Sequence, residues 1–337
     1  MATHILVTGG AGFIGSHYVR TLLATNREVR VTVLDRLTYA GDRANLAAVE
    51  AHPGFRFLPG DIGDPAIVED VIGGVDGVDH VVHFAAETHV DRSISGGQEF
   101  VRTNVLGTHV LLDAAVRHGV RRFVHVSTDE VYGSIPHGSW PEEHPLRPSS
   151  PYSASKASSD LLALASHTTY GLDVCVTRCC NNYGPRQYPE KLIPLFVTRL
   201  LAGQSVPLYG TGANSREWLH VDDHVAALER VRTAGRAGHV YNIGSGVELT
   251  NRELTALLLD ACGVGWDRVE PVTDRPGHDL RYAVDSAKIR RELGWEPRRE
   301  FRAALAETVA WYRRHGGPPR PAPKPRPAEV TPPAAHA

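Results

Sequence analysis

The sequence predicts an α/β fold: a doubly wound parallel sheet with a smaller, interleaved C-terminal domain. Three observations support this prediction. Short β-branched runs alternate with longer helical patterns through the first half of the chain. A glycine-rich turn lies between the first strand and the first helix. After about residue 180 the alternation ends and turn residues become frequent, which indicates a change of domain.

The elements of the first domain follow from these patterns in chain order. Because apolar strands alternate with helices, the sheet is expected to be parallel and covered by helices on both faces. Beyond residue 180, helical patterns return at Thr250–Cys262 and Arg302–Tyr312. The expected strands are His4–Thr8, Val29–Leu34, His80–Phe84, Arg122–Val126 and Val174–Thr177, and the expected helices are Ile14–Ala24, Val101–Val116 and Ser153–Thr169.

The predicted domain boundaries place residues 1–180 and about 218–246 in the first domain. Residues of about 181–217 and 247–316 form the second, which is threaded in and out of the first. Residues 317–337 hold eight prolines in 21 residues, so they cannot form a packed element and are expected to be disordered. A ligand for a proline-binding partner is the alternative interpretation of this tail.

Composition argues against several classes of protein. The net charge of −2 disfavours a nucleic-acid binder, which needs a clustered basic face. No apolar run reaches the roughly 18 residues of a transmembrane helix, and no secretory signal is apparent, so a cytoplasmic protein is expected. No zinc pattern is found among the 18 histidines, and no metal site is expected. Buried free thiols are expected for the four cysteines, Cys175, Cys179, Cys180 and Cys262, which lack CxxC spacing.

Gly9, Gly12 and Gly15 form a GxxGxxG turn between the first strand and the first helix. Glycine permits a tight turn and lets the backbone approach a pyrophosphate, while the helix N-terminus offers N–H groups and a positive dipole end. Such a triplet can also be a plain turn. The context favours a Rossmann-type dinucleotide site, because Asp35 ends the second strand 20 residues after Gly15 and can accept hydrogen bonds from a ribose 2′-hydroxyl.

Asp35 also indicates which dinucleotide binds. A carboxylate here would repel the 2′-phosphate of NADP, so NAD is expected. The adjacent Arg36 could accommodate that phosphate, although we interpret it as a solvated side chain. Asp61 and Ile62 follow the third strand and could bracket an adenine.

A tyrosine and a lysine form the first candidate catalytic pair. Tyr152 and Lys156 stand at i and i+4 near the start of a helix, so they share one face. Tyrosine is a poor base at neutral pH, and a nearby ammonium together with a positive nicotinamide ring would lower its pKa. YxxxK also occurs by chance on helix surfaces.

The second candidate motif is a hydroxyl followed by two acids. Thr128, Asp129 and Glu130 come directly after the strand Arg122–Val126. Ligands of open α/β sheets bind at the carboxyl ends of the strands, so this triplet should lie over the cofactor crevice. A helix-capping cluster is the alternative, but two consecutive acids beside a hydroxyl are unusual for a mere turn.

These motifs resemble the extended short-chain dehydrogenase/reductases and, within them, the dTDP-glucose 4,6-dehydratase family. The resemblance runs from residue 4 to about 315. The Thr-Asp-Glu triplet discriminates, because similar sugar epimerases carry small residues at positions 129 and 130. Thr88, Arg36 and Ser245 replace the usual serine, lysine and glycine without putting the chemistry in doubt. The matching stretches are TGGAGFIGSH, LDRLTYAG, HFAAETHVDRSI, STDEVYG, PYSASKASSD, NNYGPRQYPEKLIP, REWLHVDDH, YNIGSG and DRPGHDLRYAVD.

The resemblance implies an NAD site and a nucleotide-sugar site. Arg216 and Lys191 are the expected partners of the diphosphate, because arginine binds phosphate bidentately; solvated surface charges are the alternative. The implied NAD-binding residues are Gly9, Gly12, Phe13, Ile14, Gly15, Asp35, Arg36, Leu37, Thr38, Asp61, Ile62, Phe84, Ala85, Ala86, Thr103, Tyr152, Lys156 and Asn182. The implied substrate-binding residues are Thr88, Thr128, Asn181, Lys191, Leu192, Pro207, Tyr209, Arg216, Asn251, Arg275 and His278.

The resemblance also implies a reaction, the conversion of dTDP-glucose to dTDP-4-keto-6-deoxyglucose and water. Tyr152 would take the 4-hydroxyl proton while C4 gives hydride to NAD⁺, with Thr128 and Lys156 orienting the reactants. Glu130 would take the C5 proton, and Asp129, as the neutral acid, would protonate the leaving 6-hydroxyl. Hydride would then return to C6, so NAD should stay tightly bound between turnovers.

Other functions share part of this pattern. A UDP-hexose 4-epimerase or UDP-glucuronate decarboxylase would use the glycine turn and the Tyr/Lys pair but not the two acids. A non-catalytic NAD-binding regulator would need neither. Thymidine is favoured by resemblance only, and UDP- or GDP-sugars fit the same spacing. In relatives, helices such as Val101–Val116 and Ser153–Thr169 pair into a four-helix bundle across a dimer, so the resemblance implies a homodimer.

Overall fold

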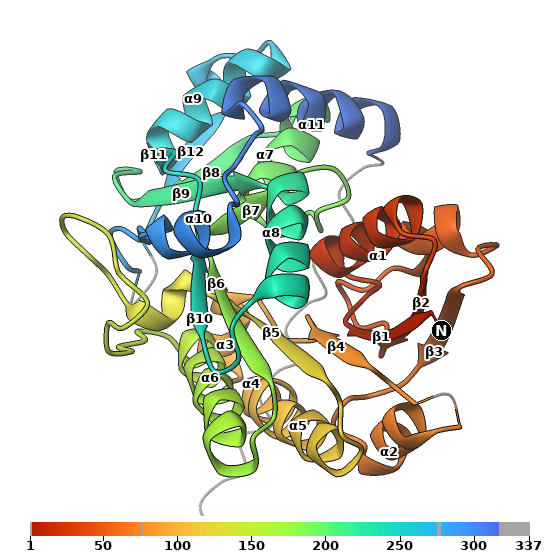
Figure 1. Ribbon diagram of the computed structural model, residues 1–337. Coiled ribbons are helices and arrows are strands. Elements are labelled where there is room, and N and C mark those ends of the chain that lie inside the picture. The colour runs from red at the N-terminus through yellow and green to blue at the C-terminus, as the bar shows by residue number, and fades with distance from the viewer. Residues whose placement is uncertain (1, 76, 275–277, 317–337) are drawn as a thin grey trace, which may run out of the picture.

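The central element is a parallel sheet. The computed structural model describes residues 2–75, 77–274 and 278–316, so the proline-rich tail lies outside the described residues. Within them, seven strands form one sheet in the order β10-β6-β5-β4-β1-β2-β3, and every neighbouring pair is parallel. This confirms the predicted doubly wound α/β fold (Figure 1). The strands are β1 (Thr3–Thr8), β2 (Val29–Asp35), β3 (Phe55–Pro59), β4 (His80–His83), β5 (Arg122–Thr128), β6 (Val174–Cys179) and β10 (Val240–Ile243).

Helices cover both faces of this sheet, which explains why its strands are continuously apolar. In β1, Ile5 and Val7 point into one buried core while Leu6 points into the other. The first core is closed by α1 (Phe13–Thr25), α8 (Val221–Ala234) and α10 (Ala287–Leu293), and the second by α2 (Pro65–Gly73), α5 (Thr108–Arg117) and α6 (Pro151–Tyr170).

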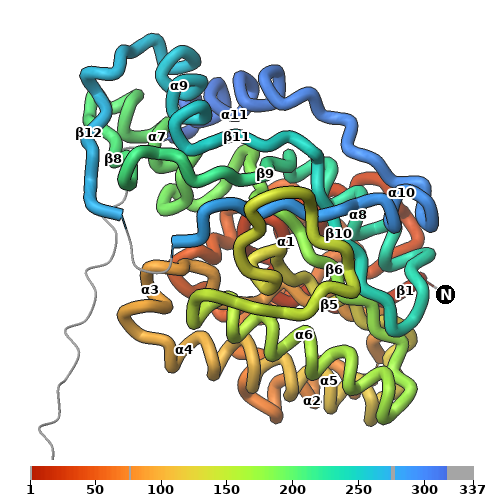
Figure 2. Tube along the Cα trace, turned by 90° about the vertical axis from the view of Figure 1, so that its left-hand side faces the viewer, coloured from red at the N-terminus to blue at the C-terminus, as the bar shows by residue number. Residues whose placement is uncertain are grey.

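A smaller C-terminal part has its own core and stands at one end of the large sheet (Figures 1 and 2). It contains a three-stranded sheet, β11-β9-β7, and a parallel pair, β12-β8. The elements are β7 (Asn181–Tyr183), α7 (Leu192–Leu201), β8 (Val206–Tyr209), β9 (Ser215–His220), β11 (Glu248–Thr250), α9 (Asn251–Cys262), β12 (Val269–Val272) and α11 (Phe301–His315).

The chain passes between the two parts several times. It leaves the large sheet at β7, returns with α8 and β10, and leaves again at β11. Helix α10 then returns to the first core, where Ile289 and Trp295 are buried. The sequence assigned all of residues 247–316 to the second domain, so it did not predict that α10 packs on the first core. The division at the predicted residues stays a prediction.

The predicted helix Val101–Val116 has a different internal structure. It consists of a π-helical segment η2 (Val101–Gly107) and α5, and α4 (Gln98–Phe100) directly precedes it. Asn104 of the π-helical segment is buried and donates to the Ser155 hydroxyl of α6 at 2.9 Å and to the Glu87 carbonyl. The other predicted elements agree with the structure to within three residues, and the remaining short helices are η1 (Arg43–Val49), α3 (Val90–Ser95), η3 (Asp129–Tyr132) and η4 (Trp266–Arg268).

The cysteines are free thiols, as predicted. Cys175, Cys179 and Cys180 are buried, whereas Cys262 is only partly buried. The prediction of burial is therefore wrong for Cys262, which lies at the end of α9 near the surface of the smaller part.

Candidate active site

A cavity of about 950 Å³ lies between the carboxyl ends of the large sheet's strands and the smaller part. It brings together nearly all of the sequence-predicted site residues. Every predicted NAD-binding residue lines it except Leu37. Of the predicted substrate-binding residues, all line it except Arg275, which lies outside the described residues. Of the predicted catalytic residues, Thr128, Glu130, Tyr152 and Lys156 line it, and Asp129 lies buried directly behind.

The glycine turn forms a close-fitting cradle at one end of the cavity. A Cβ on Gly15 would come within 2.4 Å of the Gly9 carbonyl oxygen, and a Cβ on Gly9 within 2.6 Å of the Ala85 nitrogen. Gly9 also has a φ of +70°, which side chains rarely adopt. These glycines are therefore required by geometry, and they leave the N-terminus of α1 open towards the cavity, as a pyrophosphate needs.

Asp35 is held rigidly at the end of β2. Its Oδ2 accepts from the Ala11 N–H and its Oδ1 from the Leu37 N–H, both at 2.8 Å. Burial raises the pKa of Asp35, and these two hydrogen bonds oppose the rise. Arg36 forms an ion pair with Asp61 at 2.9 Å. Leu37 has a φ of +53° and an exposed side chain, which explains why it does not line the cavity.

The Thr-Asp-Glu triplet forms the turn that ends β5. Thr128 is the N-cap of η3, and its hydroxyl accepts from the Glu130 N–H at 3.3 Å. The same hydroxyl donates to Asp129 Oδ1 at 3.2 Å. Thr128 therefore caps a helix, as the alternative interpretation proposed. Thr128 and Glu130 also line the cavity, so the cap does not exclude a functional role.

Asp129 is an unusual acid. Its side chain is buried, and Oδ2 has no hydrogen-bond partner within the described part of the chain. Burial, and then the charge of Glu130, raise the pKa of Asp129 well above its ordinary value. A carboxyl group in such surroundings is kept neutral and can donate a proton.

Tyr152 and Lys156 lie in the first turns of α6, which opens with a capping box between Ser150 and Ser153. The Lys156 ammonium donates to the Val126 carbonyl at 2.8 Å, and burial lowers its pKa to about 8. Burial raises the pKa of Tyr152 well above its usual range, and the charges of Glu130 and Asp129 add to the rise.

In the protein alone the pKa of Tyr152 is thus raised, and its expected lowering by Lys156 together with the nicotinamide ring stays a prediction. Burial is the main cause of the rise, and the two carboxyl groups that face the phenol from η3 add to it. The Lys156 ammonium donates to the backbone of β5. A bound nicotinamide ring would bring a further positive charge to the phenol.

The predicted substrate residues come from the smaller part and from the loops facing it. Arg216 of β9 is buried, donates to the Ser215 and Asp279 carbonyls, and places its guanidinium 4.4 Å from the Tyr282 ring centre. Lys191 donates to the Thr88 carbonyl at 2.7 Å. Both cations line the cavity.

The cavity is also lined by residues that the sequence patterns did not indicate, among them Tyr282, Glu190 and Arg92. The Tyr282 hydroxyl donates to Asp279, and burial followed by the charge of Glu130 raises its pKa. Arg92 lies 3.5 Å from Glu190. Each falls in a stretch that carried the family resemblance, so the signal was present, but no spacing rule separates these residues from their neighbours.

Comparison with known proteins decides between the functions that share this pattern. The family model described as GDP-mannose 4,6 dehydratase matches residues 6–308. A dTDP-glucose 4,6-dehydratase of Streptomyces antibioticus is 64% identical over 315 residues, covering 92% of each chain. The chain belongs to the dTDP-glucose 4,6-dehydratase family.

Solved structures of the family show the same architecture. The dTDP-glucose 4,6-dehydratase DesIV of Streptomyces venezuelae, solved with NAD and a dTDP ligand, is 60% identical with a TM-score of 0.90, covering 93% of this chain and 98% of that one. A UDP-glucose 4-epimerase of Thermotoga maritima is 32% identical with a TM-score of 0.86, over 93% and 99%. Because the epimerase shares the fold, the distinction rests on site residues.

Within residues 2–75, 77–274 and 278–316, no group of three or more histidine, cysteine or acidic side chains is arranged to hold a metal ion. In the same part of the chain, no helix has the length and apolar character needed to cross a membrane.

Proposed function

We propose that the chain catalyses the 4,6-dehydration of dTDP-glucose with bound NAD, giving dTDP-4-keto-6-deoxyglucose and water. This function and this cofactor agree with membership of the dTDP-glucose 4,6-dehydratase family, whose compared members are 60–64% identical to this chain. The observation that carries the proposal is the turn at the end of β5, which presents Thr128 and Glu130 to the cavity that Tyr152 lines, with Asp129 buried behind. An epimerase would have no use for these two acids.

The hydride half of the site is formed by Tyr152, Lys156 and Thr128. Tyr152 takes the proton of the sugar 4-hydroxyl, and Thr128 orients the same oxygen. Lys156 holds the nicotinamide ribose. When bound, NAD⁺ accepts the C4 hydride and later gives it back at C6. Its positive ring also opposes the rise in the pKa of Tyr152 that burial and the two carboxyl groups cause.

The elimination half is formed by the two acids. Oxidation of C4 makes the C5 hydrogen acidic, and Glu130 removes it as a carboxylate. Asp129, whose pKa is raised by burial and by Glu130, protonates the leaving 6-hydroxyl, which departs as water. Hydride addition at C6 and return of the proton from Glu130 to C5 complete the product and regenerate NAD⁺. Tyr152 then loses a proton to solvent and Asp129 regains one from solvent, so each turnover releases one water and leaves the protein unchanged.

The remaining lining residues bind the two nucleotides. The glycine cradle and Asp35 fit the pyrophosphate and adenosine ribose of NAD, because Gly9 and Gly15 leave no room for a Cβ and the acid stands at the end of β2. Arg216 and Lys191 meet the substrate diphosphate, which is supported by their positive charges in the lining of the same cavity. Since NAD is regenerated without leaving, we expect it to remain bound through purification.

The direct test is turnover without added cofactor. Purified protein incubated with dTDP-glucose alone should give the 4-keto-6-deoxy product, because NAD is retained and recycled. Product is followed by mass spectrometry as the loss of one water, with UDP-glucose and GDP-mannose run in parallel. Turnover of a UDP- or GDP-hexose but not of dTDP-glucose would overturn the assignment of the base. Interconversion of C4 epimers without loss of water would overturn the dehydratase function.

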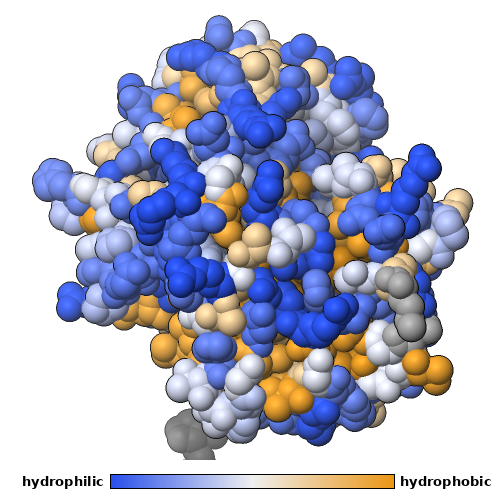
Figure 3. Space-filling model, in the orientation of Figure 1, coloured by the Kyte–Doolittle hydropathy of each residue, from blue (hydrophilic) through white to orange (hydrophobic). Residues whose placement is uncertain are grey.

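We also propose a homodimer in which η2, α5 and α6 pair across the interface. Val101 and Leu106 of η2 and Leu161 of α6 expose more than half of their surfaces. These helices lie side by side at the base of the molecule (Figure 2), where Figure 3 shows apolar residues gathered on the surface. Such an apolar face fits a partner of the same kind. The cytoplasmic location expected from the sequence stays a prediction.

The dimer is tested by charge placed in this face. Leu161→Glu should convert a dimer to a monomer in sedimentation, because a buried unpaired carboxylate disfavours association. Leu201→Glu, at the end of α7 on the smaller part, is the matched control and should leave the wild-type mass unchanged. A wild-type chain that sediments as a monomer at working concentration would rule the dimer out.

A further inference from the structure

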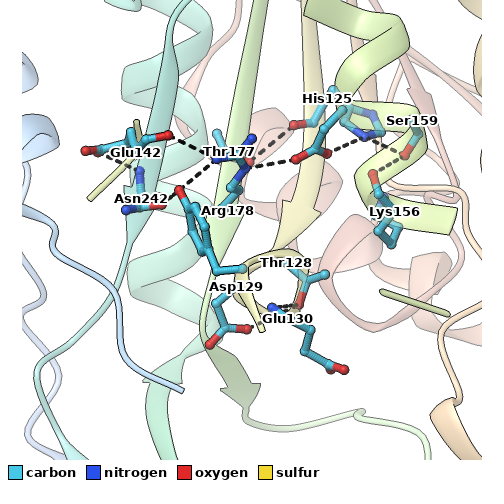
Figure 4. A network of polar contacts seen from close by, with 12 residues as sticks. His125, Thr128, Asp129, Glu130, Glu142, Lys156, Ser159, Thr177, Arg178 and Asn242 are labelled. Carbon is cyan, nitrogen blue, oxygen red and sulfur yellow. Dashed lines mark hydrogen bonds and ion pairs between the residues drawn. The ribbon is translucent and has the colours of Figure 1, made fainter. Parts of the chain in front are cut away.

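A chain of buried polar contacts runs behind the reacting face of the site (Figure 4). It joins β5, β6, α6 and the η3 turn through side chains that line no part of the cavity. Its centre is Arg178 of β6, whose surface is 3% exposed. The cost of desolvation offsets most of the attraction in a buried ion pair, so net stability alone does not explain this network.

The Arg178 guanidinium donates three hydrogen bonds, of which two go to side chains. Its Nε donates to Asp160 Oδ2 at 2.9 Å, and its Nη1 donates to the Tyr132 hydroxyl at 2.8 Å. The guanidinium also lies 4.7 Å from the centre of the Tyr132 ring and donates to the Glu142 carbonyl. Because the guanidinium is a rigid planar fork, its two arms fix their partners relative to each other.

The two partners belong to the two halves of the proposed reaction. Asp160 stands on α6, one turn beyond Lys156 and two beyond Tyr152, so one arm of Arg178 holds the hydride half. Tyr132 is the last residue of η3, the turn that carries Asp129 and Glu130, so the other arm holds the elimination half.

A second link strengthens the helix side. His125 of β5 lies 3.1 Å from the Ser159 hydroxyl and 3.3 Å from Asp160 Oδ1, and Ser159 donates to the Lys156 carbonyl at 2.8 Å. Burial and the Lys156 charge lower the pKa of His125 to about 4, so the ring is neutral at physiological pH. Burial alone would raise the pKa of Asp160, but the His125 hydrogen bond and the Arg178 charge outweigh it, so Asp160 stays ionised.

We propose that Arg178 is a positioning residue that sets the spacing between Tyr152/Lys156 and Asp129/Glu130, and so couples C4 oxidation to elimination. The inference rests on the proposed dehydration. The two acids must meet C5 and O6 of a sugar whose C4 is already held by Tyr152, so an error in spacing falls on the second step. A misplacement of about 1 Å can slow a reaction up to about a hundredfold.

The test is Arg178→Lys, which keeps the charge but cannot reach both partners at once. We expect kcat for dehydration to fall by about tenfold or more, with the KM for dTDP-glucose little changed. Reduced nicotinamide should accumulate in a single turnover, because oxidation outpaces elimination. If the substitution only lowered stability, the molecules that remain folded would keep the wild-type kcat and would not accumulate reduced nicotinamide.

Arg122→Lys is the matched control. Arg122 makes a partly buried ion pair with Asp173 at 2.9 Å, at the opposite end of β5, and also donates to the Val231 carbonyl. Arg122→Lys should lower the melting temperature while keeping wild-type kcat, with no accumulation of reduced nicotinamide.

Two outcomes would overturn the inference. The first is that Arg178→Lys behaves as Arg122→Lys does, with wild-type kcat and no reduced nicotinamide. If Arg178→Lys does not fold, Tyr132→Phe takes its place. It removes the hydroxyl of η3 that accepts from Arg178 and donates to Asn242. Wild-type kinetics of Tyr132→Phe is the second outcome. If the wild-type chain does not dehydrate dTDP-glucose, the proposed function is wrong, which is a separate outcome from the two above.

Discussion

Replacement of Glu130 by glutamine is expected to stop dehydration while leaving oxidation of C4 intact. The amide has the same shape as the carboxylate but cannot accept the C5 proton. Loss of a positioned base costs about 10²- to 10⁴-fold, so product formation should fall by at least about a hundredfold. Hydride would still pass from C4, and the reduced nicotinamide that forms cannot be reoxidised at C6. Stopped-flow absorbance of reduced nicotinamide measures this trapping.

The local geometry favours a clean result for this variant. The Glu130 backbone is held by the Thr128 cap, so the turn should keep its shape when only the side chain changes. Glu143→Gln, an exposed acid outside the cavity, is the matched control and should behave as wild type. If Glu130→Gln dehydrates dTDP-glucose at the wild-type rate, Glu130 is not the C5 base.

Replacement of Tyr152 by phenylalanine is expected to abolish the first step instead. Without the phenol oxygen, nothing in this position can take the 4-hydroxyl proton, and hydride cannot leave C4. We expect both product formation and reduced nicotinamide to fall by about 10²- to 10⁴-fold. Single-turnover absorbance with dTDP-glucose checks the hydride step, and NAD released from denatured protein checks that the cofactor is still held.

A tyrosine on the same helix supplies the control for this variant. Tyr170 ends α6 with two thirds of its surface exposed, so Tyr170→Phe removes a hydroxyl from the same helix without touching the cavity. It should retain wild-type kinetics. Rapid formation of reduced nicotinamide by Tyr152→Phe would contradict the assignment of this residue as the base for oxidation.

The two variants together separate the halves of the site. Glu130→Gln should form reduced nicotinamide without product, and Tyr152→Phe should form neither. This contrast follows from where the residues lie: Tyr152 comes from α6 and Glu130 from η3, and each carries a different proton. The Arg178 arms join these same two elements, so the Arg178→Lys phenotype is expected to resemble a mild form of Glu130→Gln.

Much of the fold could be predicted because its signals are local. The apolar runs of β1 and β5, the glycine turn, and the Thr250 capping box that starts α9 each depend on a few neighbouring residues. The π-helical segment at Val101–Gly107 could not be predicted, because it depends on contacts such as that of Asn104 with Ser155, which are distant in sequence. The return of α10 to the first core was missed for the same reason.

The sequence by itself determined the chemical inventory: the glycine turn, Asp35 at the end of a strand, the Tyr152/Lys156 spacing and the Thr-Asp-Glu triplet. These are patterns of residue type over short distances, and the chemistry they allow follows from the residue types. Only the tertiary structure decided their electrostatics. The raised pKa values of Tyr152 and Asp129, the engagement of Lys156 by β5, and the Arg178 link between α6 and η3 depend on burial and on charges distant in sequence, which exist only once the chain is folded.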